Sequence, residues 1–266
     1  MNSPIGVFDS GIGGLTVAHA IKSALPNETL IYFGDTAHLP YGDKSEAAVQ
    51  AYSIKIADVL LNKGCKVIVI ACNSASSAAY ELLKEYTGKK AKVINVIDPM
   101  VKYLEEHYAN KKVGLIGTKR TVTSNVYHKK VKQLRKNIEL VSLATPLLVP
   151  MIEEGFFNNK ISHEIIEKYL NNKLFDNISA LVLGCTHYPL VNSQITKYFG
   201  GEVDILDSSE ITTTYLKQYL IESGILNLEK TGEDRFIVSD YTESFEASTK
   251  IFFKEKVKLE KHLLWD

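Results

Sequence analysis

The sequence predicts an α/β protein of two pseudo-symmetric domains, each a mainly parallel sheet flanked by helices. Three observations lead to this prediction. Short apolar runs alternate with longer stretches of helical period, which is typical of βαβ units. Two of the runs, residues 67–71 and 181–184, match each other, and a cysteine follows each of them. The segments 5–10 and 113–118, which begin the two halves, also resemble each other.

The expected strands are short and rich in valine, isoleucine and leucine, as is typical of strands buried on both faces of a parallel sheet. They span residues 5–9, 29–34, 67–71, 93–96, 112–117, 139–143, 180–184, 204–206 and 235–239. Helices are expected in most of the intervals, where apolar residues recur with helical spacing. They span residues 13–24, 45–63, 74–86, 99–108, 124–136, 149–154, 163–172, 190–198, 210–223 and 245–253.

The internal resemblance indicates a duplicated chain. In each half a strand that ends beside a hydroxyl residue, Ser10 or Thr118, precedes the cysteine-bearing strand by a similar interval. We expect a first domain of residues 1–97 plus 209–266 and a second domain of residues 98–208. The segment after residue 208 has no counterpart, so it should pack back onto the first half. An active site would then lie in the cleft between the domains, a preferred location for small-molecule sites.

Composition narrows the class of protein. Lys plus Arg and Asp plus Glu both total 31 in 266 residues, so the formal net charge is zero and gives no electrostatic footprint for nucleic acid or an anionic membrane. No apolar stretch is long enough to span a bilayer, and none resembles a targeting segment. Three cysteines are too few for a disulfide scaffold. We therefore expect a cytoplasmic protein with reduced thiols.

Two cysteines carry the strongest chemical signal. Cys72 precedes Asn73 and Ser74, and Cys185 precedes Thr186 and His187, so each thiol is expected beside hydrogen-bonding groups where a parallel strand ends. That edge is where open α/β sheets hold ligands. A helix N-terminus there would favour a thiolate. The third cysteine, at position 65, has no polar neighbours of this kind and is interpreted as a small core residue.

Two loops are weaker candidates. The loop from Asp9 through Ser10 to Gly14 contains three glycines, but its spacing is neither that of a dinucleotide site nor that of a P-loop. Its N–H groups could bind an anion while Asp9 binds an ammonium group, or it could be a tight turn with a helix cap. The turn containing Tyr41 and Gly42 could bind a distal carboxylate or simply begin a helix.

Alternatives remain for the cysteines. His187 could relay protons and Glu153 could orient it, although a solvated helix face explains Glu153 equally well. A zinc site is disfavoured because no closely spaced ligand pairs are present. A Cys–His nucleophile, as in thiol hydrolases or amidotransferases, is the main competitor and belongs to a different class of enzyme. It explains one cysteine and leaves the other without a role.

Four motifs, in order along nearly the whole chain, resemble those of the glutamate racemases of the aspartate/glutamate racemase superfamily. They are Asp-Ser-Gly-Ile-Gly-Gly-Leu at 9–15, Leu-Pro-Tyr-Gly at 39–42, Ala-Cys-Asn-Ser-Ala at 71–75 and Gly-Cys-Thr-His-Tyr-Pro-Leu at 184–190. The Thr-His-Tyr-Pro run resembles glutamate enzymes more than aspartate racemases. Ser74 stands where the family often has threonine, and both residues offer a hydroxyl.

The resemblance implies a cofactor-independent enzyme, with no metal, that interconverts L- and D-glutamate and supplies D-glutamate for peptidoglycan. It implies that Cys72 takes the α-proton from D-glutamate, that Cys185 takes it from L-glutamate, and that the opposite cysteine returns a proton. It also suggests a homodimer. Glutamate is then the expected partner, and neither nucleic acid nor a membrane is expected.

Matching positions also imply the members of the site. The catalytic residues would be Cys72, Cys185, Asp9, His187 and Glu153. The substrate-binding residues would be Asp9, Ser10, Tyr41, Gly42, Asn73, Ser74, Thr186 and His187. Within this set, Asn73, Ser74 and Thr186 are expected to hold the α-carboxylate and amine. An offset of one residue would exchange Glu153 for Glu154.

Overall fold

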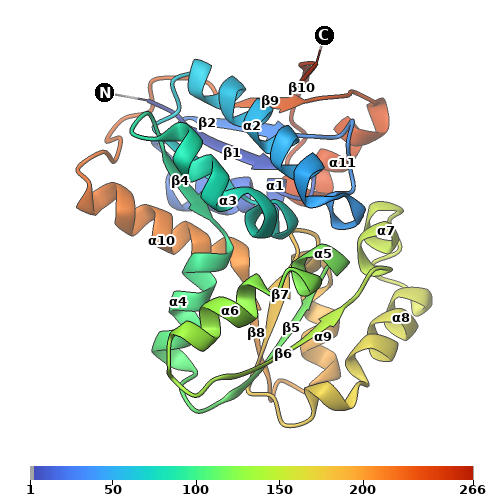
Figure 1. The fold of residues 1–266 in the computed structure, drawn as a ribbon. Helices are drawn as coiled ribbons and strands as arrows, with labels where there is room; N and C mark the ends of the chain where they lie inside the picture. Colours follow the sequence, from blue (N-terminus) through green and yellow to red (C-terminus); the bar gives the residue numbers. More distant parts are fainter. Residues whose placement is uncertain (1–2, 266) are drawn as a thin grey trace.

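The computed structural model describes residues 3–265 and contains two parallel sheets, one above the other in Figure 1. Every strand pair in the first sheet is parallel. Its order is β10 (Leu259–Lys261), β9 (Arg235–Val238), β2 (Leu30–Gly34), β1 (Ile5–Asp9), β3 (Val67–Ile70) and β4 (Lys92–Asn95). The second sheet is also parallel, in the order β6 (Glu139–Ala144), β5 (Lys112–Gly117), β7 (Ala180–Gly184) and β8 (Asp204–Asp207).

The two sheets repeat one topology, since the order β2-β1-β3-β4 in the first corresponds to β6-β5-β7-β8 in the second. The predicted fold class of two pseudo-symmetric α/β domains is therefore confirmed. The segment after β8 returns to the first sheet, where β9 pairs with β2 and β10 pairs with β9. The domain limits at 97/98 and 208/209 stay a prediction. Among residues 3–265, no helix is long and apolar enough to cross a membrane.

Helices cover both faces of each sheet (Figure 1). They are α1 (Leu15–Ala24), α2 (Glu46–Asn62), α3 (Asn73–Thr87), α4 (Ile97–His107), α5 (Lys119–Thr123), α6 (Val126–Gln133), α7 (Leu148–Glu153), α8 (Lys160–Leu170), α9 (Asn192–Tyr198), α10 (Ser208–Glu222) and α11 (Glu243–Phe253). Short 3₁₀ turns occur at η1 (Tyr41–Asp43), η2 (Lys173–Phe175) and η3 (Tyr188–Val191).

The central strands explain this layering because both of their faces are apolar. In β3, Val67 and Val69 pack in one hydrophobic cluster together with α1, whereas Ile68 and Ile70 pack in another with α2 and α3. All four side chains are fully buried. Alternating side chains point to opposite faces of a strand, so a continuous apolar run needs a helical layer on each side.

Several element boundaries differ from the sequence prediction for local reasons. The helix expected at 99–108 begins at Ile97, because Oδ1 of Asn95 accepts hydrogen bonds from the N–H groups of Ile97 and Asp98. The helix expected at 124–136 begins at Val126, after Asn125 adopts a left-handed conformation with φ of 56°. The sequence prediction does not include helix α5 or strand β10. Both are short, with five residues in α5 and three in β10.

The loop after β1 lies flat against the end of β2, and Gly34 permits this contact. A Cβ atom added at Gly34 would lie 2.2 Å from the carbonyl oxygen of Gly11. The hydroxyl of Tyr32 donates to the same oxygen at 2.8 Å. A side chain at residue 34 would therefore push the glycine-rich loop away from the sheet.

Replacing Gly34 with alanine should lower the free energy of unfolding by about 1–3 kcal/mol, the usual cost of overpacking a closed site. Urea unfolding followed by circular dichroism measures this cost. The control is Gly232→Ala, because the atoms nearest to a Cβ there belong to the side chain of Thr29, at 3.1–3.7 Å, and not to the backbone. An equal loss of stability in both variants would contradict the role given to Gly34.

Candidate active site

A cavity of about 260 Å³ lies where the carboxyl ends of strands from both sheets meet. All the predicted site residues except Asp9 line it: Ser10, Tyr41, Gly42, Cys72, Asn73, Ser74, Glu153, Cys185, Thr186 and His187. Thr118, Lys119 and Thr145 are further wall residues that the sequence prediction did not include. One chamber is therefore built from loops of both halves of the chain.

Cys72 lies at the N-terminus of α3, directly beyond β3. Its Sγ accepts a hydrogen bond from the N–H of Ala75 at 3.4 Å and lies 3.6 Å from Oγ of Ser10. The thiol is only 6 % exposed. Burial, followed by the negative charge of Asp9, raises the pKa of Cys72 to about 12. In the ligand-free protein Cys72 is therefore a protonated thiol at neutral pH.

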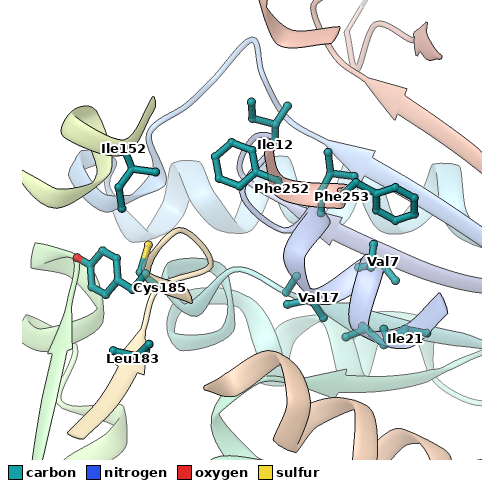
Figure 2. Close-up of a cluster of buried hydrophobic side chains, with 14 of the residues drawn as sticks. Val7, Ile12, Val17, Ile21, Ile152, Leu183, Cys185, Phe252 and Phe253 are labelled. Carbon is teal, nitrogen blue, oxygen red and sulfur yellow. The ribbon is translucent and has the colours of Figure 1, made fainter. Parts of the chain in front are cut away.

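Cys185 lies directly beyond β7 and has a different environment. Figure 2 shows it at the end of its strand beyond Leu183, with its sulfur directed away from Leu183. Its Sγ lies 3.8 Å from Nδ1 of His187, and Nε2 of the same ring lies 3.0 Å from Oε1 of Glu153. Cys185, His187 and Glu153 thus form a continuous chain of polar atoms at the cavity wall.

His187 is 5 % exposed, and its ring also meets the edge of Phe252 at a centroid distance of 5.2 Å. Burial favours the neutral ring, but the hydrogen bonds with Cys185 and Glu153 outweigh it and raise the pKa of His187 to about 10. At neutral pH the ring is an imidazolium. Its positive charge is placed to compensate a thiolate on Cys185.

Asp9 is fully buried and does not line the cavity. One carboxylate oxygen accepts hydrogen bonds from the N–H groups of Gly11 and Gly14, at 3.1 and 3.0 Å. The other accepts from Oγ1 of Thr186 at 3.5 Å. Burial raises the pKa of Asp9, while the charge of His187 and the loop N–H groups oppose this shift.

The N–H groups of the glycine-rich loop therefore bind the side chain of Asp9 itself. Gly13 has a second function, since a Cβ atom there would lie 2.3 Å from Cε1 of His187. Gly14 would clash in the same way with Cβ of Asp9, at 2.4 Å. The loop thus packs directly on two of the predicted catalytic residues. A contact between Asp9 and a substrate ammonium group stays a prediction.

Tyr41 lines the cavity, but its hydroxyl donates to Oδ2 of Asp35 at 2.5 Å. Asp35 is fully buried and also accepts from Oγ of Ser239 at 2.6 Å. The single proton of the Tyr41 hydroxyl is thus directed to Asp35 and not into the cavity. The sequence prediction does not include Asp35, although its place directly after β2, at the same sheet edge as Asp9, is a signal that could identify it.

Replacing Glu153 with glutamine should lower the pKa of His187 from its value of about 10, because one of the two groups that raise it loses its charge. Nitrogen NMR of histidine-labelled protein, titrated from pH 6 to 11, measures the midpoint. Glu154→Gln is the matched control, since Glu154 is the adjacent exposed glutamate and Glu153 is the one that contacts His187. A His187 midpoint that is the same in both variants would show that Glu153 does not hold the imidazolium.

Comparisons with known proteins agree with this geometry. Residues 6–216 match the Asp/Glu/Hydantoin racemase family. Glutamate racemase 3 of Caldanaerobacter subterraneus subsp. tengcongensis is 39 % identical over 96 % of this chain and 92 % of its own length. A glutamate racemase of Neisseria meningitidis serogroup B is 41 % identical over 89 % of this chain and 87 % of its own length.

Solved structures give the same result. The glutamate racemase of Francisella tularensis, in complex with D-glutamate, superposes with a TM-score of 0.92 at 39 % identity and covers 99 % of this chain and 98 % of that one. The isoform RacE1 of Bacillus anthracis gives a TM-score of 0.92 at 33 % identity, covering 98 % and 97 %. The chain belongs to the glutamate racemases of the Asp/Glu/Hydantoin racemase family.

Proposed function

We propose that the protein interconverts L- and D-glutamate without a cofactor, by removing the α-proton with one cysteine and returning a proton from the other. The observation that carries this proposal is that Cys72 and Cys185, from equivalent strand ends of the two sheets, line one cavity. The Francisella relative, which is described in complex with D-glutamate, supports glutamate as the substrate.

The chemical difficulty is the weak acidity of an α-proton beside a carboxylate. With no electron sink, the protein must stabilise the developing charge through fixed hydrogen-bond donors in a site that excludes water. The side chains of Asn73, Ser74 and Thr186 are buried at this cavity and can supply donors. They are proposed to hold the α-carboxylate and amine. Gly42 and the Tyr41 turn are proposed to hold the distal carboxylate, with Ser10 completing the pocket.

The two thiols are proposed to begin in different protonation states. Cys72 is held as a thiol by burial and by Asp9, while the His187 imidazolium can compensate a thiolate on Cys185. This pair is ready to accept the proton of L-glutamate at Cys185 and to donate one from Cys72 to the opposite face. D-Glutamate requires the reverse pair. The enantiomers have equal free energies in water, so kcat/KM must be equal in the two directions.

A thiol hydrolase is the second candidate, and a specific observation favours it. Cys185, His187 and Glu153 are connected in the order of a nucleophile, its base and an orienting carboxylate. Such an enzyme would form an acyl-thiol intermediate and release ammonia from an amide substrate. It would need only one cysteine, and Cys72 would be dispensable.

The cellular role is part of the same proposal. We propose that the product D-glutamate is used for peptidoglycan synthesis and that the enzyme acts in the cytoplasm as a homodimer. The three cysteines are all buried free thiols, which suits a reducing compartment. Membership of the glutamate racemases is the other observation that supports this cellular role.

Replacing either Cys72 or Cys185 with serine should lower the rate of racemisation by about 10³-fold or more in both directions. A serine hydroxyl is a far weaker acid than a thiol, and every turnover needs a thiol on each face of the α-carbon. Circular dichroism of L- and D-glutamate solutions measures the rate. Cys65→Ala is the control, since Cys65 is buried outside the cavity and should retain full activity.

Two other outcomes are informative. Ammonia release from glutamine that survives in Cys72→Ser and disappears in Cys185→Ser would favour the hydrolase. Racemisation that survives in either serine variant at the wild-type rate would contradict the two-cysteine mechanism. Unfolding curves for each variant separate loss of chemistry from loss of fold.

A further inference from the structure

We propose that Tyr127 is a positioning residue that fixes the orientation of the Asn73 side-chain amide, so that its NH₂ group is available to the substrate carboxylate. This inference rests on the proposed function. The hydroxyl of Tyr127 donates to Oδ1 of Asn73 at 2.8 Å. Both residues are nearly inaccessible, with exposures of 1 % and 3 %.

The other end of the same amide has no partner. Nδ2 of Asn73 is buried and makes no hydrogen bond to any residue within 3–265. Asn73 also lines the cavity, next to Cys72. A buried donor without a partner is costly in a folded protein, and a bound carboxylate oxygen would satisfy it. One end of the amide is therefore held by the protein, and the other end has no hydrogen-bond partner among the described residues.

The two ends of an asparagine amide have nearly the same shape and opposite hydrogen-bonding character. If the amide turned over, its carbonyl oxygen would take the place of the unpaired NH₂ group and would repel a carboxylate bound there. Tyr127 opposes this rotation because its hydroxyl offers a proton to Oδ1. Burial raises the pKa of Tyr127, so the phenol keeps this proton at all working pH values.

The hydrogen bond crosses from one half of the protein to the other. Tyr127 belongs to α6, which covers the second sheet, whereas Asn73 is the first residue of α3, which covers the first sheet (Figure 1). The next residue, Ser74, is linked in the same way, since its Oγ lies 2.8 Å from Oγ1 of Thr118 after β5. The second domain thus sets the geometry of donors that the first domain presents.

The test is Tyr127→Phe, which keeps the ring in the core of the second domain and removes only the hydroxyl. The amide of Asn73 is then free to present either end. Glutamate can bind only the protein in which the NH₂ end is presented, so a smaller competent fraction should raise KM for both L- and D-glutamate about tenfold, with kcat within about twofold of wild type.

The matched control is Tyr108→Phe. Tyr108 lies in the same hydrophobic cluster, and its hydroxyl donates to Oδ2 of Asp204 at 2.8 Å. Tyr108 does not line the cavity. Both variants lose one tyrosine hydroxyl and one hydrogen bond, so similar losses of stability are expected, but only Tyr127→Phe should raise KM.

A double variant tests whether Tyr127 changes KM through Asn73. In Asn73→Leu the amide is absent, so adding Tyr127→Phe should change KM no further. An additional rise there, or an unchanged KM in the single Tyr127→Phe variant of a wild type that racemises glutamate, would overturn the role of Tyr127 alone. A wild type that does not racemise glutamate would overturn the proposed function, and this inference with it.

Discussion

The structure depends on one constraint: two buried thiols from different sheets must reach the same small cavity. A parallel sheet satisfies half of this constraint, since its strands all end at the same edge and the residue that follows a central strand lies there. The chain satisfies the other half by repeating the strand order and bringing the two edges together. Cys72 and Cys185 occupy equivalent places after β3 and β7. A cavity of about 260 Å³ between them has room for a ligand the size of an amino acid.

The two cysteines occupy equivalent positions, but the charged groups around their sulfur atoms differ. Cys72 has a buried carboxylate near it, and Cys185 has a buried histidine. The first neighbour disfavours a second negative charge, while the second neighbour compensates one. The two thiols therefore have different electrostatic surroundings. The proposed transfer requires such a difference, because two thiols or two thiolates could not both remove a proton and return one.

Much of this could be predicted from the sequence, and the remainder could not for identifiable reasons. The central strands and both cysteine positions were predictable because each depends on a local apolar run and the residue that follows it. Strand β10 was missed because three residues carry no periodic signal, and only pairing with β9 makes them a strand. The pairing of Tyr41 with Asp35 was missed because nothing in the loop indicates which way the hydroxyl turns.

Contacts between the halves were the hardest to foresee. Tyr127 and Asn73 are 54 positions apart and belong to different sheets, so no motif connects them. The position of Asp9 shows a related limit: its place after β1 was predictable, but its burial beneath the glycine-rich loop depends on the N–H groups that bind it. Sequence patterns identified the residues at the sheet edge. Tertiary packing decided which of them face the cavity.

The most direct measurement of the two-sided transfer is the isotope content of glutamate early in the reaction in D₂O. The wild-type protein is incubated with L-glutamate until the reaction has gone less than one tenth of the way to equilibrium. The enantiomers are then separated, and the deuterium content of each is measured by mass spectrometry. Proton removal by one cysteine and return from the other should give D-glutamate with one deuterium at the α-carbon, while the remaining L-glutamate stays unlabelled. Label appearing equally in both enantiomers from the start, or D-glutamate that keeps the original proton, would show that a single base acts and would contradict the opposed thiols.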